Sequence, residues 1–422
     1  MKFSKLLLAM AASGIATSAF ATNGYFAHGI GVKAKAMGGA SIAFAEDGFG
    51  AAANPANLAQ VKDGYSVGVS AFAPDRASTI STGSVGGNEA ADAFAVPEFV
   101  YNKTHNDKIN WGVVVYGNGG MNVDYGQSIY DAAGCGQNCG LGANRTTTSN
   151  LEQLFIAPTI SYKINDRNTV GASLNLVYQR FEATGLGNFS GFTSNQNTDP
   201  GNHGVDDASG VGIKLGWNGT LSDSVTAGAF YQPKTSMDKF TAYKDLFAQG
   251  GGFDIPETYG VGIAVKASPK TNVALDVVQI NYSGIKSLAN LNDNMQAGGG
   301  ALGTENGLGF GWSDMTVYKL GMAHQMDANT TIRAGWNYGK QPISASQLDF
   351  NLLAPAVVEH HFTFGMTRVL DKNSDFSIHA MYAPKVELNG VAANASASDG
   401  TGSVSKLEMS QYEIGVQYSK KF

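Results

Sequence analysis

The stretch TVGASLNLVYQ, residues 169–179, alternates apolar residues with small or polar ones. Val170, Leu174 and Tyr178 fall on one face, whereas Ser173 and Asn175 fall on the other. A repeat of two residues predicts a β-strand with one apolar face. The same alternation recurs in ETYGVGIAVKA, residues 257–267, and in TIRAGWNYG, residues 331–339. The chain therefore reads as a β protein.

The lengths of the connections distinguish a membrane barrel from a soluble β-sandwich, which would show the same alternation. Tight connections, such as INDRN (164–168), SPKTN (268–272) and LDKNS (370–374), take turns with long polar ones, such as GNFSGFTSNQNTDPGNHGVDD (187–207). Outer-membrane barrels combine short periplasmic turns with long outer loops. The pattern predicts an all-β fold, a 14-stranded antiparallel transmembrane β-barrel.

The strands are expected at residues 64–73, 94–103, 108–124, 151–163, 168–182, 209–220, 224–235, 256–267, 271–285, 313–325, 329–340, 357–370, 373–387 and 405–422. In the last of them Tyr412, Ile414, Val416 and the terminal Phe422 share one face. A closing strand with an apolar outer face and a terminal aromatic residue resembles the assembly signal of bacterial outer-membrane barrels. The barrel is expected to span residues 64–422.

The N-terminus has the features of an export signal. Lys2 and Lys5 precede a short apolar run, and Ala19 and Ala21 provide a small-residue cleavage site. Residues 1–21 are therefore predicted to be a signal peptide, which is consistent with a bacterial outer-membrane location. Only 15% of the residues are charged, and the net charge of −6 gives no indication of a nucleic-acid partner.

The two cysteines lie together in GCGQNCG, as Cys135 and Cys139. In an exported protein a local loop disulfide between them is expected. A metal site would need more ligands than two thiols, and no histidine is near them in the sequence.

A barrel of about 14 strands is too wide for its own side chains to fill, so it must hold water, a ligand or a plug. Residues 22–63 are rich in Ala and Gly and contain short potential helices interrupted at Asn54-Pro55. Proline disfavours a helical conformation in the residue before it, and the Asn54 side chain can hydrogen-bond to the nearby backbone. From these residues alone, a lumenal hatch and a periplasmic arm are equally consistent.

A family resemblance favours the hatch. NGYFAHGIGVKAKAMGGASIAFAEDGFGAAANPANLA, residues 23–59, contains a GGA run, an acidic ED pair and the triplet Asn54-Pro55-Ala56. It resembles the N-terminal hatch of the outer-membrane long-chain fatty acid and aromatic hydrocarbon transporter family (FadL/TodX type). The later segments SDMTVYKLG, TIRAGWNYG and FNLLAPAVVEHHFTFG resemble that family's C-terminal strands. The resemblance implies a barrel, a hatch over residues 22–63 and uptake of hydrophobic molecules, with no cofactor.

The resemblance also implies a kinked third strand that opens the wall sideways. The third predicted strand, INWGVVVYGNGGMNVDY, is interrupted by Gly117, Gly119 and Gly120. Glycine within a strand often marks a bulge or a bend. The alternative is a strand that simply ends in a glycine turn.

Candidate ligand contacts come from the alternation and from the mature N-terminus. Tyr25, Phe26 and His28 are expected to reach an apolar pocket, and Lys319 and Arg333 are expected to point inward, where either could bind a carboxylate. In the alternative interpretation, these two cations pair with acidic residues. The candidates for that pairing are Glu46, Asp47 and Glu413, and the other inward-facing basic residues are Lys214, Lys266, His361 and His379.

The predicted function is passive transport of hydrophobic small molecules, most of all long-chain fatty acids, by a monomer in contact with outer-membrane lipid. Uptake of aromatic or alkane hydrocarbons is the alternative, and a general porin is a weaker one. An enzyme is not expected, because a hydrolase would need an activated nucleophile and no G-x-S-x-G motif occurs.

Overall fold

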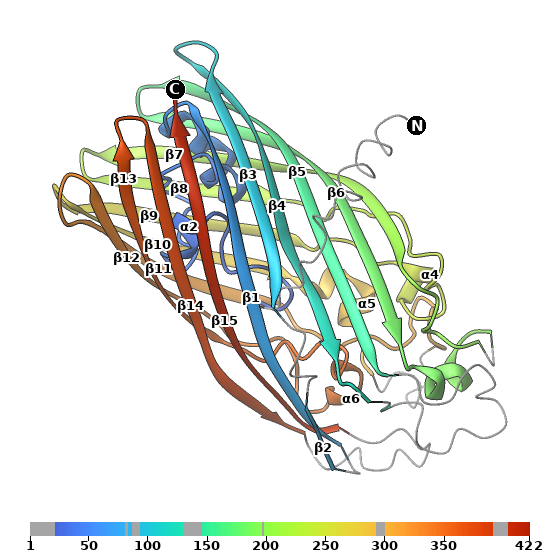
Figure 1. Ribbon diagram of the computed structural model, residues 1–422. Coiled ribbons are helices and arrows are strands. Elements are labelled where there is room, and N and C mark those ends of the chain that lie inside the picture. Colours follow the sequence, from blue (N-terminus) through green and yellow to red (C-terminus); the bar gives the residue numbers. More distant parts are fainter. Residues whose placement is uncertain are drawn as a thin grey trace.

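The computed structural model describes residues 22–80, 83–86, 93–127, 129, 146–195, 198–292, 300–390 and 404–422. Within them one antiparallel sheet closes on itself, because the first strand pairs with the last (Figure 1). Fourteen of its fifteen described strands form the wall. They are β1 (Gly64–Ile80), β3 (Phe94–Thr104), β4 (Ile109–Asp124), β5 (Thr148–Asn165), β6 (Asn168–Thr184), β7 (Asp206–Ser222), β8 (Val225–Gln232), β9 (Glu257–Ser268), β10 (Thr271–Asn281), β11 (Met315–Gln325), β12 (Thr330–Gly339), β13 (His360–Asp371), β14 (Ser374–Asn389) and β15 (Val404–Lys421).

The predicted 14-stranded antiparallel barrel is therefore confirmed. The sequence missed the outer end of β1, which continues to Ile80 and pairs there with a short extra strand, β2 (Gly83–Gly86). The polar residues after Ala73 had concealed this extension. Three predicted strand ends were too long by a few residues, at the ends of β8 and β10 and at the start of β13. The apolar residues there, such as Ile285 and Val357, pack into the loops instead of the wall.

The outer face of the wall carries the apolar residues that the alternation assigned to lipid. Val261 is 59% exposed and Ile414 is 65% exposed, and Tyr318, Leu320 and Phe364 behave in the same way. The inward positions are buried and mostly polar, as is usual for wide membrane barrels. Within the described ranges, no helix has both the length and the apolar character needed to cross a membrane.

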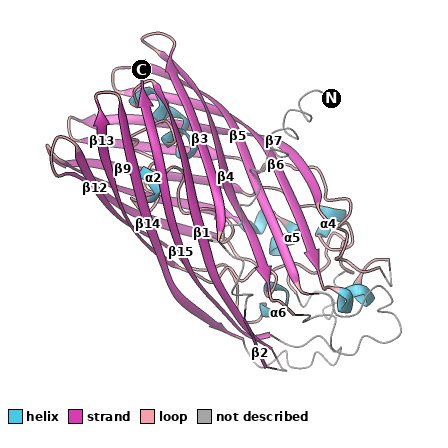
Figure 2. Cartoon of the chain, in the orientation of Figure 1, coloured by secondary structure: helices cyan, strands magenta, loops and turns pink. Residues whose placement is uncertain are grey.

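Short helices occur at the end of the barrel where the long loops lie (Figure 2). They are η2 (Gly187–Phe192), α4 (Ala248–Gly251), η3 (Tyr282–Gly284), α5 (Lys286–Ala289) and α6 (Leu348–Asn351). Four of them, all but α4, contribute residues to a buried cluster rich in aromatic side chains, which also contains Phe253 and Trp312. This cluster covers the outer end of the lumen with apolar side chains.

The segment before β1, residues 22–63, lies inside the barrel. It contains α2 (Val32–Lys35), α3 (Gly50–Ala53) and the 3₁₀-helix η1 (Pro55–Gln60). Lys35 bonds to Glu413 on β15, whereas Asn54 bonds to the backbone of Trp217 on β7. The segment thus reaches from one side of the lumen to the other. The predicted signal peptide, residues 1–21, and the predicted disulfide, Cys135–Cys139, lie outside the described residues.

Candidate ligand-binding site

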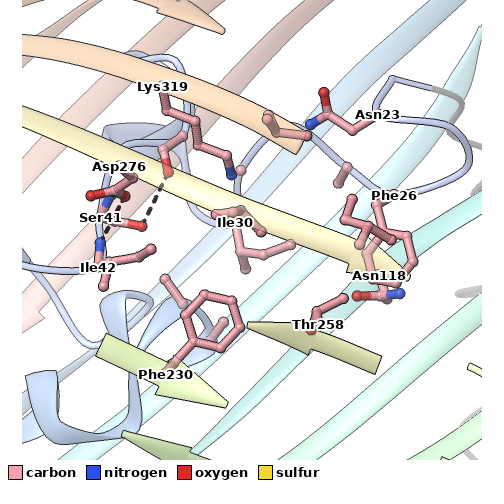
Figure 3. A pocket seen from close by; sticks show the side chains of 18 of the residues that line it. Asn23, Phe26, Ile30, Ser41, Ile42, Asn118, Phe230, Thr258, Asp276 and Lys319 are labelled. Atoms are coloured by element: carbon pink, nitrogen blue, oxygen red, sulfur yellow. Dashed lines mark hydrogen bonds between the residues drawn. The ribbon is translucent and has the colours of Figure 1, made fainter. Parts of the chain in front are cut away.

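A pocket lies between the N-terminal segment and the wall (Figure 3). Phe26, Ile30 and Ile42 line it from the segment, and Tyr116 and Phe230 line it from the wall. Most of the remaining lining is apolar or amide-bearing, and among the described lining residues the charged side chains are Lys214, Asp276 and Lys319. The pocket is thus an apolar chamber with a few polar groups.

The two lysines bond to main-chain oxygens of the N-terminal segment. Lys319 Nζ donates to the carbonyl oxygen of His28 at 3.0 Å, and Lys214 Nζ donates to that of Ala52 at 2.6 Å. Lys214 Nζ also lies 5.1 Å from the centre of the Phe230 ring, a cation–π contact. Each ammonium group carries three donors, so each keeps capacity for a further acceptor.

Asp276, on β10, bonds to the N-terminal segment between the points that the two lysines contact. Its Oδ2 accepts the main-chain N–H groups of Ser41 at 2.7 Å and of Ile42 at 2.9 Å (Figure 3). Basic side chains therefore outnumber acidic ones by two to one in the lining that the structure describes. The Asp276 carboxylate already accepts two main-chain N–H groups, so the pocket favours an anionic ligand group over a cationic one.

The pocket reaches the glycine-rich part of β4. The register of β4 against β5 shifts between Gly117 and Gly119, which places a β-bulge at Asn118. Because β4 continues to Asp124, the alternative of a strand that ends at the glycines is wrong. Tyr116 and Asn118 both line the pocket beside this bulge.

The wall is incompletely paired beside the bulge. The β3–β4 ladder runs from Thr104–Asn110 to Phe99–Val115, and no pair beyond it joins the described residues of these strands. The N-terminal segment occupies this free edge of β4. Ala27 N donates to Asn118 O at 2.9 Å, and Gly120 N donates to Tyr25 O at 3.0 Å. We call this contact of residues 25–27 with β4 the clasp.

The clasp depends on the absence of a side chain at Gly119. A Cβ atom built there would lie 1.8 Å from the Tyr25 carbonyl oxygen, far inside contact distance. Any larger residue would therefore push the segment off the strand. Gly119 serves close backbone approach here, which is one of the ordinary uses of glycine.

The Asn54-Pro55-Ala56 triplet fixes the other end of the segment. The Asn54 side chain is fully buried, and its Nδ2 donates to the carbonyl oxygens of Ile42 at 2.9 Å and Trp217 at 2.8 Å. Its Oδ1 accepts the N–H of Ala56 at 3.1 Å, which caps η1. Asn54 is extended, as expected for the residue before a proline.

The structure separates the five predicted ligand contacts. Phe26 and Lys319 line the pocket. Tyr25 is buried in the aromatic cluster, against Phe253, Tyr282 and Trp312. Of the five, Phe26 and Lys319 therefore adjoin the chamber, and His28 contributes the main-chain oxygen that accepts from Lys319 Nζ.

Arg333 follows the interpretation in which it pairs with an acidic residue. Its guanidinium makes two bonds to Glu46, with Nε–Oε2 at 2.6 Å and Nη2–Oε1 at 2.8 Å. Burial alone would raise the pKa of the Glu46 carboxyl, but the Arg333 charge and hydrogen bonds outweigh it and lower the pKa. Of the other predicted inward-facing bases, Lys214, His361 and His379 are buried, whereas Lys266 is exposed near a turn.

The sequence analysis did not identify Asp276 as a site residue, and it did not place Lys214 in the ligand pocket. Asp276 is the one charged residue of the strand TNVALDVVQIN and lies on its buried, lumenal side. A single carboxylate at an inward position of such a strand was the available signal, because a buried charge needs partners. Its partners, the N–H groups of Ser41 and Ile42, could not be inferred from local sequence.

Comparison with known families assigns the chain. A model of the family described as outer membrane protein transport protein (OMPP1/FadL/TodX) matches residues 8–422. The chain belongs to this family. Its members are transport channels of the bacterial outer membrane for hydrophobic compounds and are not enzymes. No curated protein matches the chain.

Several solved structures share the fold. The Pseudomonas putida toluene transporter TodX is 19% identical over 94% of this chain and 99% of its own, with a TM-score of 0.68. A Pseudomonas aeruginosa FadL homologue is 15% identical over 94% and 100%, with a TM-score of 0.70. The Ralstonia pickettii toluene transporter TbuX is 18% identical over 94% and 99%, with a TM-score of 0.67. At these identities the likeness concerns the fold.

Proposed function

We propose that this outer-membrane transporter takes up long-chain fatty acids through the pocket beside the N-terminal segment. The observation that carries the proposal is the pair of lysines, Lys214 and Lys319, in an otherwise largely apolar chamber. An apolar chain gains free energy by leaving water for such a lining. A carboxylate at its end would gain a charge-assisted hydrogen bond from either lysine. The protein acts as a monomer and uses no cofactor.

Release is proposed to run sideways through the joint between β3 and β4. The pocket already extends to Asn118, and the clasp occupies the place of the missing strand pairs. Residues 22–63 then act as a hatch, and displacement of the clasp opens a path from the chamber to lipid. An apolar ligand that follows this path avoids water, so the favourable transfer free energy is kept.

A second candidate ligand is an aromatic or alkane hydrocarbon. The toluene transporters TodX and TbuX share the fold, which supports hydrocarbons as much as the FadL homologue supports fatty acids. A hydrocarbon has no use for the two lysines, so the charge in the pocket is the feature that separates the candidates. A general porin has less support, because residues 22–63 lie inside the barrel.

The test is binding of matched ligands to the purified, folded protein. We expect oleate to bind more tightly than 1-octadecene, which has a similar chain and no carboxylate. In the variant Lys319→Met oleate should bind about tenfold more weakly, which corresponds to the loss of about one charge-assisted hydrogen bond. The binding of 1-octadecene should not weaken.

Lys266→Met is the matched control, because Lys266 is exposed and lies away from the pocket. If the wild-type protein bound both ligands with equal affinity, a hydrocarbon would replace the fatty acid as the proposed ligand. Mass spectrometry of lipids that copurify with the protein gives an independent readout. Fatty acid in the wild type and its loss in Lys319→Met would support the carboxylate assignment.

A further inference from the structure

A buried group of charged and titratable side chains lies beside α2, apart from the pocket. Lys35 Nζ is 2.9 Å from Glu413 Oε1 on β15 and 3.1 Å from Glu98 Oε1 on β3. It also donates to Ser70 Oγ at 3.2 Å. The main-chain N–H of Gly31 donates to Glu98 Oε2 at 3.2 Å. Through Glu98 this group holds the N-terminal segment to β3, whereas the clasp holds it to β4.

Three histidines surround Glu413. The His28 ring centre is 6.0 Å from that of His361 and 6.4 Å from that of His379. His28 Nδ1 is 3.7 Å from Glu413 Oε2, and His379 Nε2 is 3.5 Å from Glu413 Oε1. None of the three histidines is more than 2% exposed. The described residues offer no hydrogen-bond partner to His28 Nε2 or His379 Nδ1.

Burial is the main obstacle to adding a proton to His28 in the closed arrangement, whereas the Glu413 carboxylate favours the protonated ring. Burial lowers the pKa of His28 well below its ordinary value of 6.5; Glu413 opposes this effect, and His361, Lys35 and His379 reinforce it. Burial also acts to lower the pKa of Lys35, but Glu413 and Glu98 raise it overall, so Lys35 stays charged. Lys319 is a further basic residue near His28: it donates to the His28 carbonyl oxygen and faces Asp276. His360, another titratable side chain, is next to His361 in the chain.

We propose that His28, Lys35, Glu98, Glu413, His361 and His379 form an acid-sensitive latch that holds residues 28–39 against the wall and releases them when His28 takes up a proton. A proton on His28 would bury a second positive charge beside Lys35 in a site that excludes water, and the nearest carboxylate, Glu413, already bonds Lys35. Movement of the segment away from the wall hydrates the imidazolium and separates the two charges.

The direction of the pH effect follows from linkage. The latched arrangement binds fewer protons at His28 than a displaced, hydrated one, in which the histidine titrates near 6.5. The latch is therefore stable above about pH 6.5 and weakens as the pH falls below it. One histidine changes the equilibrium by about fivefold over the first pH unit below 6.5 and by about tenfold for each further unit. This inference concerns the packing of the segment and holds whatever the transported ligand is.

Hydrogen exchange of the full-length protein, read by mass spectrometry without ligand, tests the latch. The reporters are the amides of residues 35–39, which make main-chain bonds within the segment, such as Lys35 N to Gly31 O at 2.9 Å. After correction for chemical exchange, their protection should fall about fivefold between about pH 6.5 and about pH 5.5. The amides of the β1–β15 ladder should keep their protection. A wild-type protein with no selective loss in residues 35–39 would overturn the proposal.

Two variants assign the effect to the cluster. His28→Gln should remove the acid response, whereas the exposed loop variant His203→Gln should keep it. An unchanged acid response in His28→Gln would refute the assignment. If His28→Gln already lacks protection at about pH 7.5, NMR of the histidine-labelled wild-type protein decides. The His28 ring must gain its proton over the same pH range in which residues 35–39 lose protection, and a ring that stays neutral through that loss contradicts the latch.

Discussion

Two joints in the barrel wall differ in how they are closed. At the joint between the first and last strands, β1 pairs with β15 along its whole length, from Gly64–Lys421 to Ile80–Val404. At the β3–β4 joint the described ladder stops at Phe99–Val115, although β4 continues to Asp124. A lipid environment offers no partner to free N–H and C=O groups, so every wall group must be satisfied by protein. The N-terminal segment supplies that partner at the second joint through two main-chain bonds, so the wall there depends on a segment that is not one of its strands.

The largest effect should come from making the second joint resemble the first. Replacement of Gly117, Gly119 and Gly120 by Val should displace the clasp, remove the bulge and straighten β4, so that β4 pairs with β3 toward Phe94 and the wall closes where the clasp had been. Valine favours regular strands, whereas glycine permits bulges. Under the lateral route, oleate uptake by cells should fall to the level of cells that lack the protein, while the purified variant remains folded in heat-modifiability assays.

The control for this experiment is Gly68→Val, a glycine within the fully paired β1–β15 joint. A Cβ there would lie 3.3 Å from Val416 O, a tight contact that small shifts can relieve. Uptake should be retained in this control. A folded triple variant that still takes up oleate at the wild-type rate would rule out sideways release at this joint.

A smaller effect should follow from loosening the clasp without straightening the strand. In Gly119→Ala the new Cβ would meet the Tyr25 carbonyl oxygen, so both main-chain bonds of the clasp should be lost. At about 1 kcal/mol each, their loss should increase hydrogen exchange of residues 25–28 about thirtyfold. Gly191→Ala, where nothing lies within 4 Å of the added Cβ, should leave this exchange unchanged. Unaltered exchange in Gly119→Ala would mean that the clasp does not hold the segment.

The smallest effect should come from the fully paired joint itself. Phe422 is 65% exposed and has its ring near those of Tyr65, at 6.1 Å, and Tyr101, at 5.9 Å. Phe422→Ala should lower the free energy of unfolding of the refolded barrel by about 1 kcal/mol, the usual worth of aromatic contacts. Urea unfolding in lipid vesicles measures this change. A loss of several kcal/mol would show that the joint depends on its last residue more than on its ladder.

The barrel was predictable because its signals are local. Residues such as Val261 and Ile414 alternate with inward-facing neighbours, and short turns alternate with long loops, so both the strands and the lipid-facing side could be read from the sequence. The outer extension of β1 was missed because its residues beyond Ala73 lack the apolar alternation. Strand pairing there is decided by the β2 hairpin and by β15, which are distant or weakly marked in the sequence.

The candidate site was predictable only in part, because its contacts join distant residues. Lys319 could be placed in the lumen by alternation, but its bond to His28 connects positions 291 residues apart. Arg333 looked equally suited to a ligand, and only the three-dimensional arrangement shows that Glu46 occupies its guanidinium. The clasp was not foreseen, although Gly119, which makes it possible, was singled out for the strand interruption.

The order of the chain also constrains how the molecule is assembled. Residues 22–63 are synthesised before every strand, yet they are enclosed only when β15, the last strand made, pairs with β1. The N-terminal segment must therefore be inside before the barrel closes, since a folded segment bonded to opposite walls could not enter afterwards. Substitutions that misfold residues 22–63 would then prevent the pairing of β1 with β15, which is the last step of barrel closure.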